Sequence, residues 1–60
     1  IRKVINKASI LIKKKGKLVL EIGYDQKNKV SRILEENGFF INNVVKDYGK
    51  KDRCIISTKK

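Results

Sequence analysis

Residues whose types suit a binding or reaction site lie together in the segment Glu21-Ile22-Gly23-Tyr24-Asp25-Gln26. This segment follows a short apolar run, Lys17 to Ile22, which predicts a strand, and it precedes a predicted helix. Ligands of open α/β sheets bind at the carboxyl ends of the strands. Gly23 would let a ligand or a second backbone segment approach closely. The end of this strand is therefore the first candidate site.

Glu21 has a structural interpretation beside the functional one. It is a carboxylate within an otherwise apolar strand. Burying a charge without a partner costs several kcal/mol, so an inward-pointing Glu21 should have a cationic partner. Either a structural ion pair or a role at the site explains its position.

Other catalytic centres are excluded by the residue types that the chain lacks. The sequence contains no histidine, so nothing of that kind can activate a serine or Cys54 as a nucleophile. A single cysteine without histidine forms neither an intrachain disulfide nor a Cys/His zinc site. Neither a G-x-G-x-x-G loop nor a P-loop is present. The 60 residues thus show no self-contained active site.

The charge balance of the chain has two explanations. Sixteen Lys and Arg against six Asp and Glu give a formal net charge of +10, which favours polyanionic partners such as nucleic acid. Lysines at 3, 7 and 13–15 could form a binding face on the first predicted helix. Alternatively, the chain has a general bias toward Lys, Ile and Asn, which places lysine at solvated positions. The net charge would then reflect composition alone and not a binding role.

The hydrophobic pattern predicts the helices. Residues 1–12 place apolar side chains at helical spacing (Ile1, Val4, Ile5, Ala8, Leu11 and Ile12). Gly16 is expected to supply the left-handed turn that closes this helix. The second helix is expected to begin at an Asp25 N-cap, to point Val30, Ile33 and Leu34 inward, and to stop at Gly38.

The strands are predicted at 17–22, 39–48 and 53–58. Continuous apolar character suggests that the first is covered on both faces. The last two strands flank Asp47-Tyr48-Gly49-Lys50-Lys51-Asp52, whose Asp and Gly residues favour a turn. These strands should therefore form an antiparallel hairpin. The aromatic residues (Tyr24, Phe39, Phe40 and Tyr48) are expected to pack in the core. The order helix-strand-helix-strand-strand indicates an α/β fold with a mixed sheet.

The longest apolar run, Ile10-Leu11-Ile12, is far shorter than the roughly 20 residues of a membrane span. With no signal-peptide pattern, the cytoplasm is the expected location.

Several segments together resemble one enzyme family. They are Lys15 to Gln26, a helix ending Asn37-Gly38-Phe39, Lys46-Asp47-Tyr48-Gly49 and Asp52-Arg53. They are similar to the HemK/PrmC-type peptide chain release factor glutamine methyltransferases, over essentially all of the chain. The resemblance implies that residues 1–60 are a single partial domain, the carboxyl-terminal segment of the catalytic domain.

In that family the fold is a Rossmann-like sheet, and this chain would supply its last three strands. The final strand would lie antiparallel between its two predecessors. Members transfer a methyl group from S-adenosylmethionine to a glutamine side-chain amide of release factors. The cofactor loop and the Asn-Pro-Pro-Tyr motif of the family are absent here, so no catalytic or cofactor residue carries over and the chain alone should be inactive. The resemblance places Glu21, Gly23 and Gln26 near the substrate edge.

The implied strand order suggests a partner for Glu21. Arg53 would begin the last strand where Glu21 ends its antiparallel neighbour. We therefore predict a cross-strand ion pair between Glu21 and Arg53.

Two functional hypotheses remain. A methyltransferase segment predicts an exposed strand edge at Leu18 to Ile22, which would pair with the remainder of the domain or, in isolation, with another copy. A non-enzymatic nucleic-acid-binding module predicts lysines clustered on one face and binding that falls steeply with salt.

Overall fold

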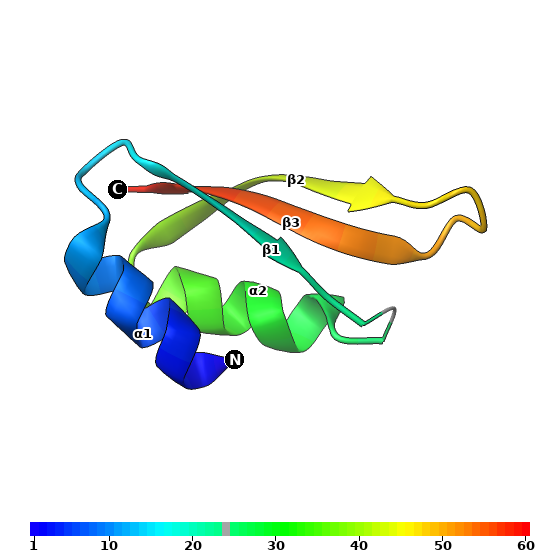
Figure 1. Ribbon diagram of the computed structural model, residues 1–60, viewed down its shortest axis with the longest axis horizontal. Helices are drawn as coiled ribbons and strands as arrows, with labels where there is room; N and C mark the ends of the chain where they lie inside the picture. The colour runs from blue at the N-terminus through cyan, green and yellow to red at the C-terminus, as the bar shows by residue number, and fades with distance from the viewer. Residues whose placement is uncertain (24) are drawn as a thin grey trace.

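A computed structural model describes residues 1–23 and 25–60. These residues fold into two helices and three strands in the predicted order (Figure 1). The elements are α1 (Arg2–Leu11), β1 (Lys17–Glu21), α2 (Lys27–Glu36), β2 (Phe39–Lys46) and β3 (Asp52–Lys59).

The three strands form one sheet in the order β1-β3-β2. The last strand therefore lies between its two predecessors, as the resemblance implied, and the predicted hairpin is confirmed. Both ladders are antiparallel. The predicted mixed sheet is not observed among these strands, because β3 separates β1 from β2 and leaves no parallel pair hydrogen-bonded.

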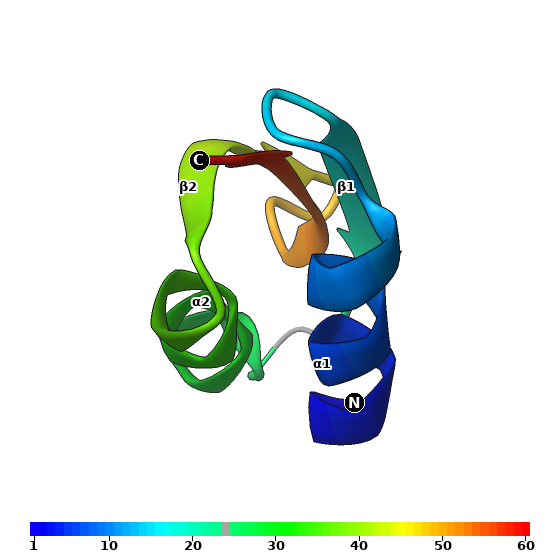
Figure 2. The same cartoon turned by 90° about the vertical axis from the view of Figure 1, so that its left-hand side faces the viewer.

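Both helices lie on one face of the sheet (Figures 1 and 2). The core forms between the layers. Buried apolar residues come from α1, α2, β2 and β3, and one more, Ile22, directly follows β1. The core residues are Ile5, Ile22, Val30, Ile33, Leu34, Phe39 and Ile55. Buried Ser57 completes this face of β3, and its hydroxyl donates to the Leu18 carbonyl at 3.0 Å. The buried hydroxyl is thus satisfied.

The second helix forms as its periodicity predicts. Val30, Ile33 and Leu34 are almost fully buried, because positions i, i+3 and i+4 share one helical face. Gly38 follows with φ of 83°, the left-handed conformation that glycine adopts without a Cβ clash. The helix begins one residue later than predicted. Gln26 rather than Asp25 is its N-cap, and it makes no side-chain capping bond.

The first helix buries a narrower stripe than predicted. Ile5 is its only buried residue, with Ala8 and the following Ile12 packed partly against the core. Val4 is 54% and Leu11 71% exposed, because α1 lies beside α2 on the same face of the sheet and is covered along one side only (Figure 2).

The turn after α1 closes at a different residue from the one predicted. The positive φ, 72°, belongs to Lys15 and not to Gly16. Gly16 is needed for space instead: a Cβ there would lie 2.5 Å from Ile12 Cγ2 and 2.9 Å from the Lys13 carbonyl oxygen.

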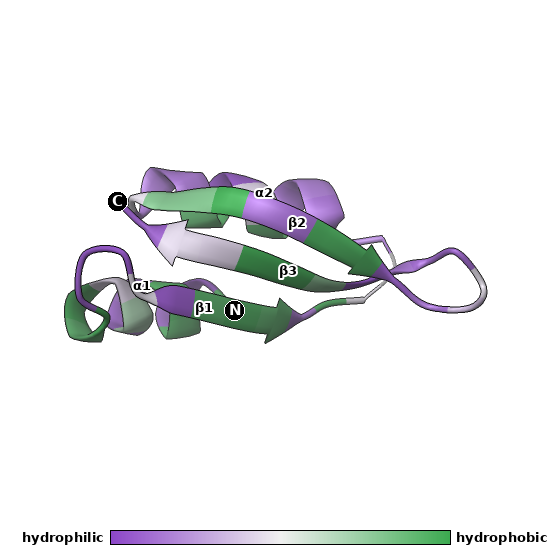
Figure 3. Ribbon diagram, turned by 90° about the horizontal axis from the view of Figure 1, so that it is seen from above, coloured by the Kyte–Doolittle hydropathy of each residue, from purple (hydrophilic) through white to green (hydrophobic). Residues whose placement is uncertain are grey.

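The other face of the sheet is open, which corrects the prediction that β1 is covered on both sides. Burial alternates along β1, and no helix lies over this face, where hydrophobic segments of the strands are visible (Figure 3). Val19 and Phe40 are more than half exposed, and Val45 is 40% exposed. Of the aromatic residues predicted for the core, Phe39 is buried, Phe40 and Tyr48 are exposed, and Tyr24 lies outside the described residues.

None of the helices in the described part of the chain combines the length and apolar character needed to cross a membrane.

Candidate functional site

The candidate site residues gather at one end of the sheet. The carboxyl ends of β1 and β2 point to this end, and β3 starts there after the 47–51 loop (Figure 1). Glu21 is the last residue of β1, Gly23 and Gln26 follow it, and Arg53 is the second residue of β3. The fold therefore brings the sequence-predicted residues to the same end of the molecule.

The loop from β1 to α2 is held by its own hydrogen bonds. The Gly23 amide donates to Gln26 Oε1 at 3.1 Å, and the Gln26 amide donates to the Gly23 carbonyl at 3.0 Å. A Cβ at Gly23 would lie 3.2 Å from Gln26 Oε1. Gly23 and Gln26 therefore act together in shaping the loop, a relation that the spacing alone did not indicate.

Glu21 and Arg53 do not form the predicted ion pair. Glu21 is in register with Cys54, and residues in register share one face of a sheet while their neighbours point to the other. The side chain of Arg53 is thus directed away from that of Glu21. Because Glu21 is exposed, its carboxylate does not require a cationic partner.

Arg53 pairs with Asp47 instead. Its Nε donates to Asp47 Oδ2 at 2.8 Å, and the Lys51 backbone amide donates to Asp47 Oδ1 at 3.0 Å. These interactions lower the pKa of the Asp47 carboxyl, with the Lys51 amide as the largest cause and the Arg53 side chain next. Asp47 thereby ties the hairpin loop to the start of β3. The sequence signal for it was an acid and an arginine flanking a glycine-containing turn.

A second carboxylate at this end is only partly compensated. Lys46 Nζ lies 3.9 Å from Asp52 Oδ1, an oxygen that is buried without a hydrogen bond from any described residue. Asp52 is the register partner of Lys46 across the hairpin.

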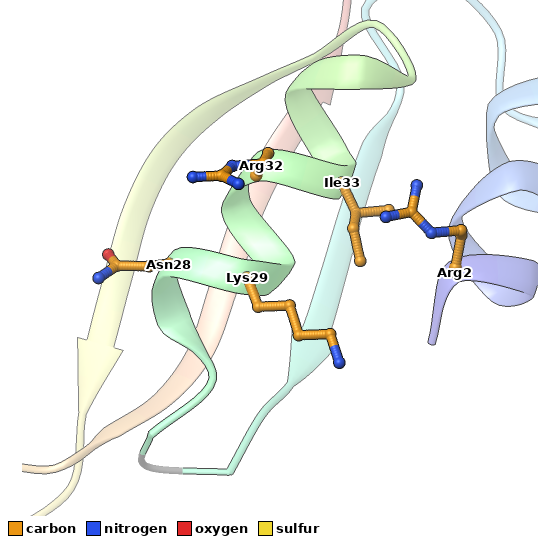
Figure 4. A pocket seen from close by; sticks show the side chains of 5 residues that line it. All are labelled: Arg2, Asn28, Lys29, Arg32 and Ile33. Carbon is orange, nitrogen blue, oxygen red and sulfur yellow. The ribbon is translucent and has the colours of Figure 1, made fainter.

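A pocket of about 410 Å³ opens elsewhere, between α1 and α2. Its lining residues are Arg2, Asn28, Lys29, Arg32 and Ile33 (Figure 4). S-adenosylmethionine carries a positive sulfonium, which three cations repel and no carboxylate of the lining attracts. The lining of this pocket therefore does not fit the sulfonium of this cofactor.

The lysines predicted to form a cationic face are all exposed. Lys3 and Lys7 lie on α1, and Lys13, Lys14 and Lys15 follow it in the turn to β1. They are not the cations that line the pocket. No cluster of His, Cys, Asp and Glu suited to a metal occurs among residues 1–23 and 25–60.

Comparison with known proteins relates the chain to one enzyme family. It is 52% identical over 48 residues to a release factor glutamine methyltransferase of Fusobacterium nucleatum, a match covering 80% of this chain and 14% of the relative. The chain is homologous to part of the release factor glutamine methyltransferases. A second such enzyme, from Clostridium acetobutylicum, is 33% identical over 58 residues, which are 97% of this chain and 20% of the relative.

A bifunctional methyltransferase of Rickettsia bellii is also similar, with 36% identity over 52 residues, 87% of this chain and 9% of the relative. The chain thus spans only a small part of the length of the curated relatives it matches. No family model matches the chain. No solved structure matches it either.

Proposed function

We propose that the chain is the carboxyl-terminal segment of the catalytic domain of a protein-(glutamine-N5) methyltransferase that acts on peptide chain release factors. The observation that carries this proposal is the 52% identity to a relative of which the match covers only 14%. On its own the chain is inactive, because the segments of the family that bind the cofactor and orient the substrate amide have no counterpart in it.

The open sheet supports a role as part of a larger domain. β1 pairs with β3 on one side only, and the opposite side, the β1 edge, leaves its backbone groups available to another strand. The remainder of a Rossmann-like domain would pair with the β1 edge and cover the exposed Val19 and Phe40. Without that remainder, the β1 edge is a site for self-association.

S-adenosylmethionine supplies the methyl group in this proposal and binds to the remainder of the domain, since the lining of the pocket in this chain does not fit it. Glu21, Gly23 and Gln26 contribute to the substrate edge from the loop at the end of β1. The Gly23–Gln26 hydrogen bond fixes the loop conformation in which Glu21 and Gln26 are presented.

A chimeric enzyme tests the proposal. In the Fusobacterium nucleatum relative, the 48 matching residues are replaced by those of this chain. Transfer of labelled methyl from S-adenosylmethionine to a bacterial release factor is then measured. The chimera is expected to methylate, whereas the relative lacking the segment and the isolated chain are not. A chimera with the circular dichroism spectrum of the relative but no methyl transfer would contradict the proposal.

A further inference from the structure

The pocket between α1 and α2 concentrates cations in a way that composition does not explain. Lysine dominates the positive residues of the chain, yet two of its three arginines, Arg2 and Arg32, line this pocket together with Lys29. Arg2 reaches it from α1, and the other lining side chains come from successive turns of α2 (Figure 4). No acidic residue is part of the lining.

The N–H groups of these cations are only partly used in hydrogen bonds and ion pairs within the protein. Arg2 Nη1 donates to Glu36 Oε1 at 3.1 Å, which directs the guanidinium and leaves other N–H groups available. Lys29 and Arg32 make no ion pair with any residue in the described ranges. Ile33 provides the apolar part of the lining.

The start of α2 adds positive potential. This end of a helix favours anions, because its first backbone amides lack partners and its dipole is positive there. Yet the first turn of α2 has no acidic residue and no side-chain cap, and it carries Lys27 and Lys29. Lysines there slightly disfavour the helix, and a bound anion would offset this effect.

We propose that this pocket binds a phosphate group, carried either by a nucleic-acid backbone or by a small phosphorylated molecule. The arginine fork donates two parallel hydrogen bonds to phosphate oxygens, and Lys29 adds a point charge. The volume of about 410 Å³ lies in the range of ligand sites. The lining residues of this site are different from Glu21, Gly23 and Gln26, and the binding proposed here does not depend on methyl transfer.

Binding measurements on the full chain test the site and distinguish the two sources. One probe is a fluorescein-labelled ten-nucleotide oligouridylate, followed by anisotropy at low salt, and the other is inorganic pyrophosphate, followed by calorimetry. Arg32→Gln removes a lining cation, and Lys60→Gln is the matched control, because it removes the same charge from an exposed position outside the pocket and outside the predicted cationic face. Circular dichroism verifies the fold of each variant, and Lys29→Gln replaces Arg32→Gln if the latter fails to fold.

We expect Arg32→Gln to weaken binding of the recognised probe about tenfold, since a charge-assisted hydrogen bond contributes that much. Lys60→Gln should weaken it less than about twofold. If the oligonucleotide binds tightly and only a large excess of pyrophosphate displaces it, the phosphate is that of a nucleic-acid backbone. Tight binding of pyrophosphate alone assigns a small molecule. Equal losses for Arg32→Gln and Lys60→Gln, or no binding of either probe, would overturn the proposal.

Discussion

At the scale of single residues, Asp47 organises the end of the sheet. One carboxylate oxygen accepts from the Lys51 amide across the loop, and the other accepts from Arg53 in β3. The carboxylate is 27% exposed and the arginine 56%, so solvent screens the pair and its net contribution is modest. Its structural effect is to fix where the hairpin loop ends and β3 begins.

The pKa of Asp47 provides the residue-scale prediction. We expect it below the ordinary value of 3.8 in the parent chain. In Arg53→Met it should rise but remain below that value, because the Lys51 amide still donates. The depressed pKa contributes stability that is complete above the ordinary value and is lost as pH falls through the lower, folded value. Carboxyl NMR titration measures this directly, and an unchanged pKa in Arg53→Met would show that the pair does not form in solution.

The difference between prediction and structure is clearest at Arg53. The family resemblance placed Arg53 near the end of β1, and the strand order confirmed that neighbourhood. Whether two side chains meet depends on the register, however, and a shift of one residue reverses the face. The register pairs Glu21 with Cys54, and no pattern in the sequence specified it. The choice of Asp47 as the partner of Arg53 followed from the loop conformation.

At the scale of elements, local periodicity predicted α2 well and α1 poorly. The inward residues of α2 are covered by the sheet, so the apolar pattern coincides with burial. The apolar pattern of α1 is wider than the stripe that contacts α2. Amphipathic spacing indicates which residues can be buried, whereas the extent of burial depends on how much protein lies against the helix.

The turn between α1 and β1 gives the element-scale prediction. Gly16→Ala places a methyl group against Ile12 and the Lys13 backbone. Overpacking of this kind lowers the free energy of unfolding by about 1–3 kcal/mol. Gly23→Ala is the matched control, because its methyl group meets the movable end of the Gln26 side chain. Chemical denaturation compares the two, and equal losses of stability would contradict the packing described at Gly16.

At the scale of the whole molecule, the sheet is covered on one face and open on the other. Helices shield the residues of one side, while Val19, Phe40 and Val45 remain exposed on the open side. Exposed apolar surface of this kind marks a contact surface. Together with the β1 edge and the small share of each relative that is matched, it supports the proposal that the chain completes a larger methyltransferase domain.

The backbone of β1 identifies the groups that such a domain would engage. The Ile22 amide donates to the Arg53 carbonyl, and the Lys59 amide donates to the Gly16 carbonyl. Because hydrogen-bonded pairs alternate along an antiparallel ladder, Leu20 is directed to β3 while Val19 and Glu21 present their amides at the β1 edge.

Amide hydrogen exchange at these positions is the most direct test. In the isolated monomeric chain, the Val19 and Glu21 amides should exchange rapidly and the Leu20 amide slowly. After addition of the Fusobacterium nucleatum relative lacking its matching segment, the Val19 and Glu21 amides should become protected as methyl transfer is restored. Protection of these amides in the monomer, or rapid exchange that persists in an active complex, would contradict the account.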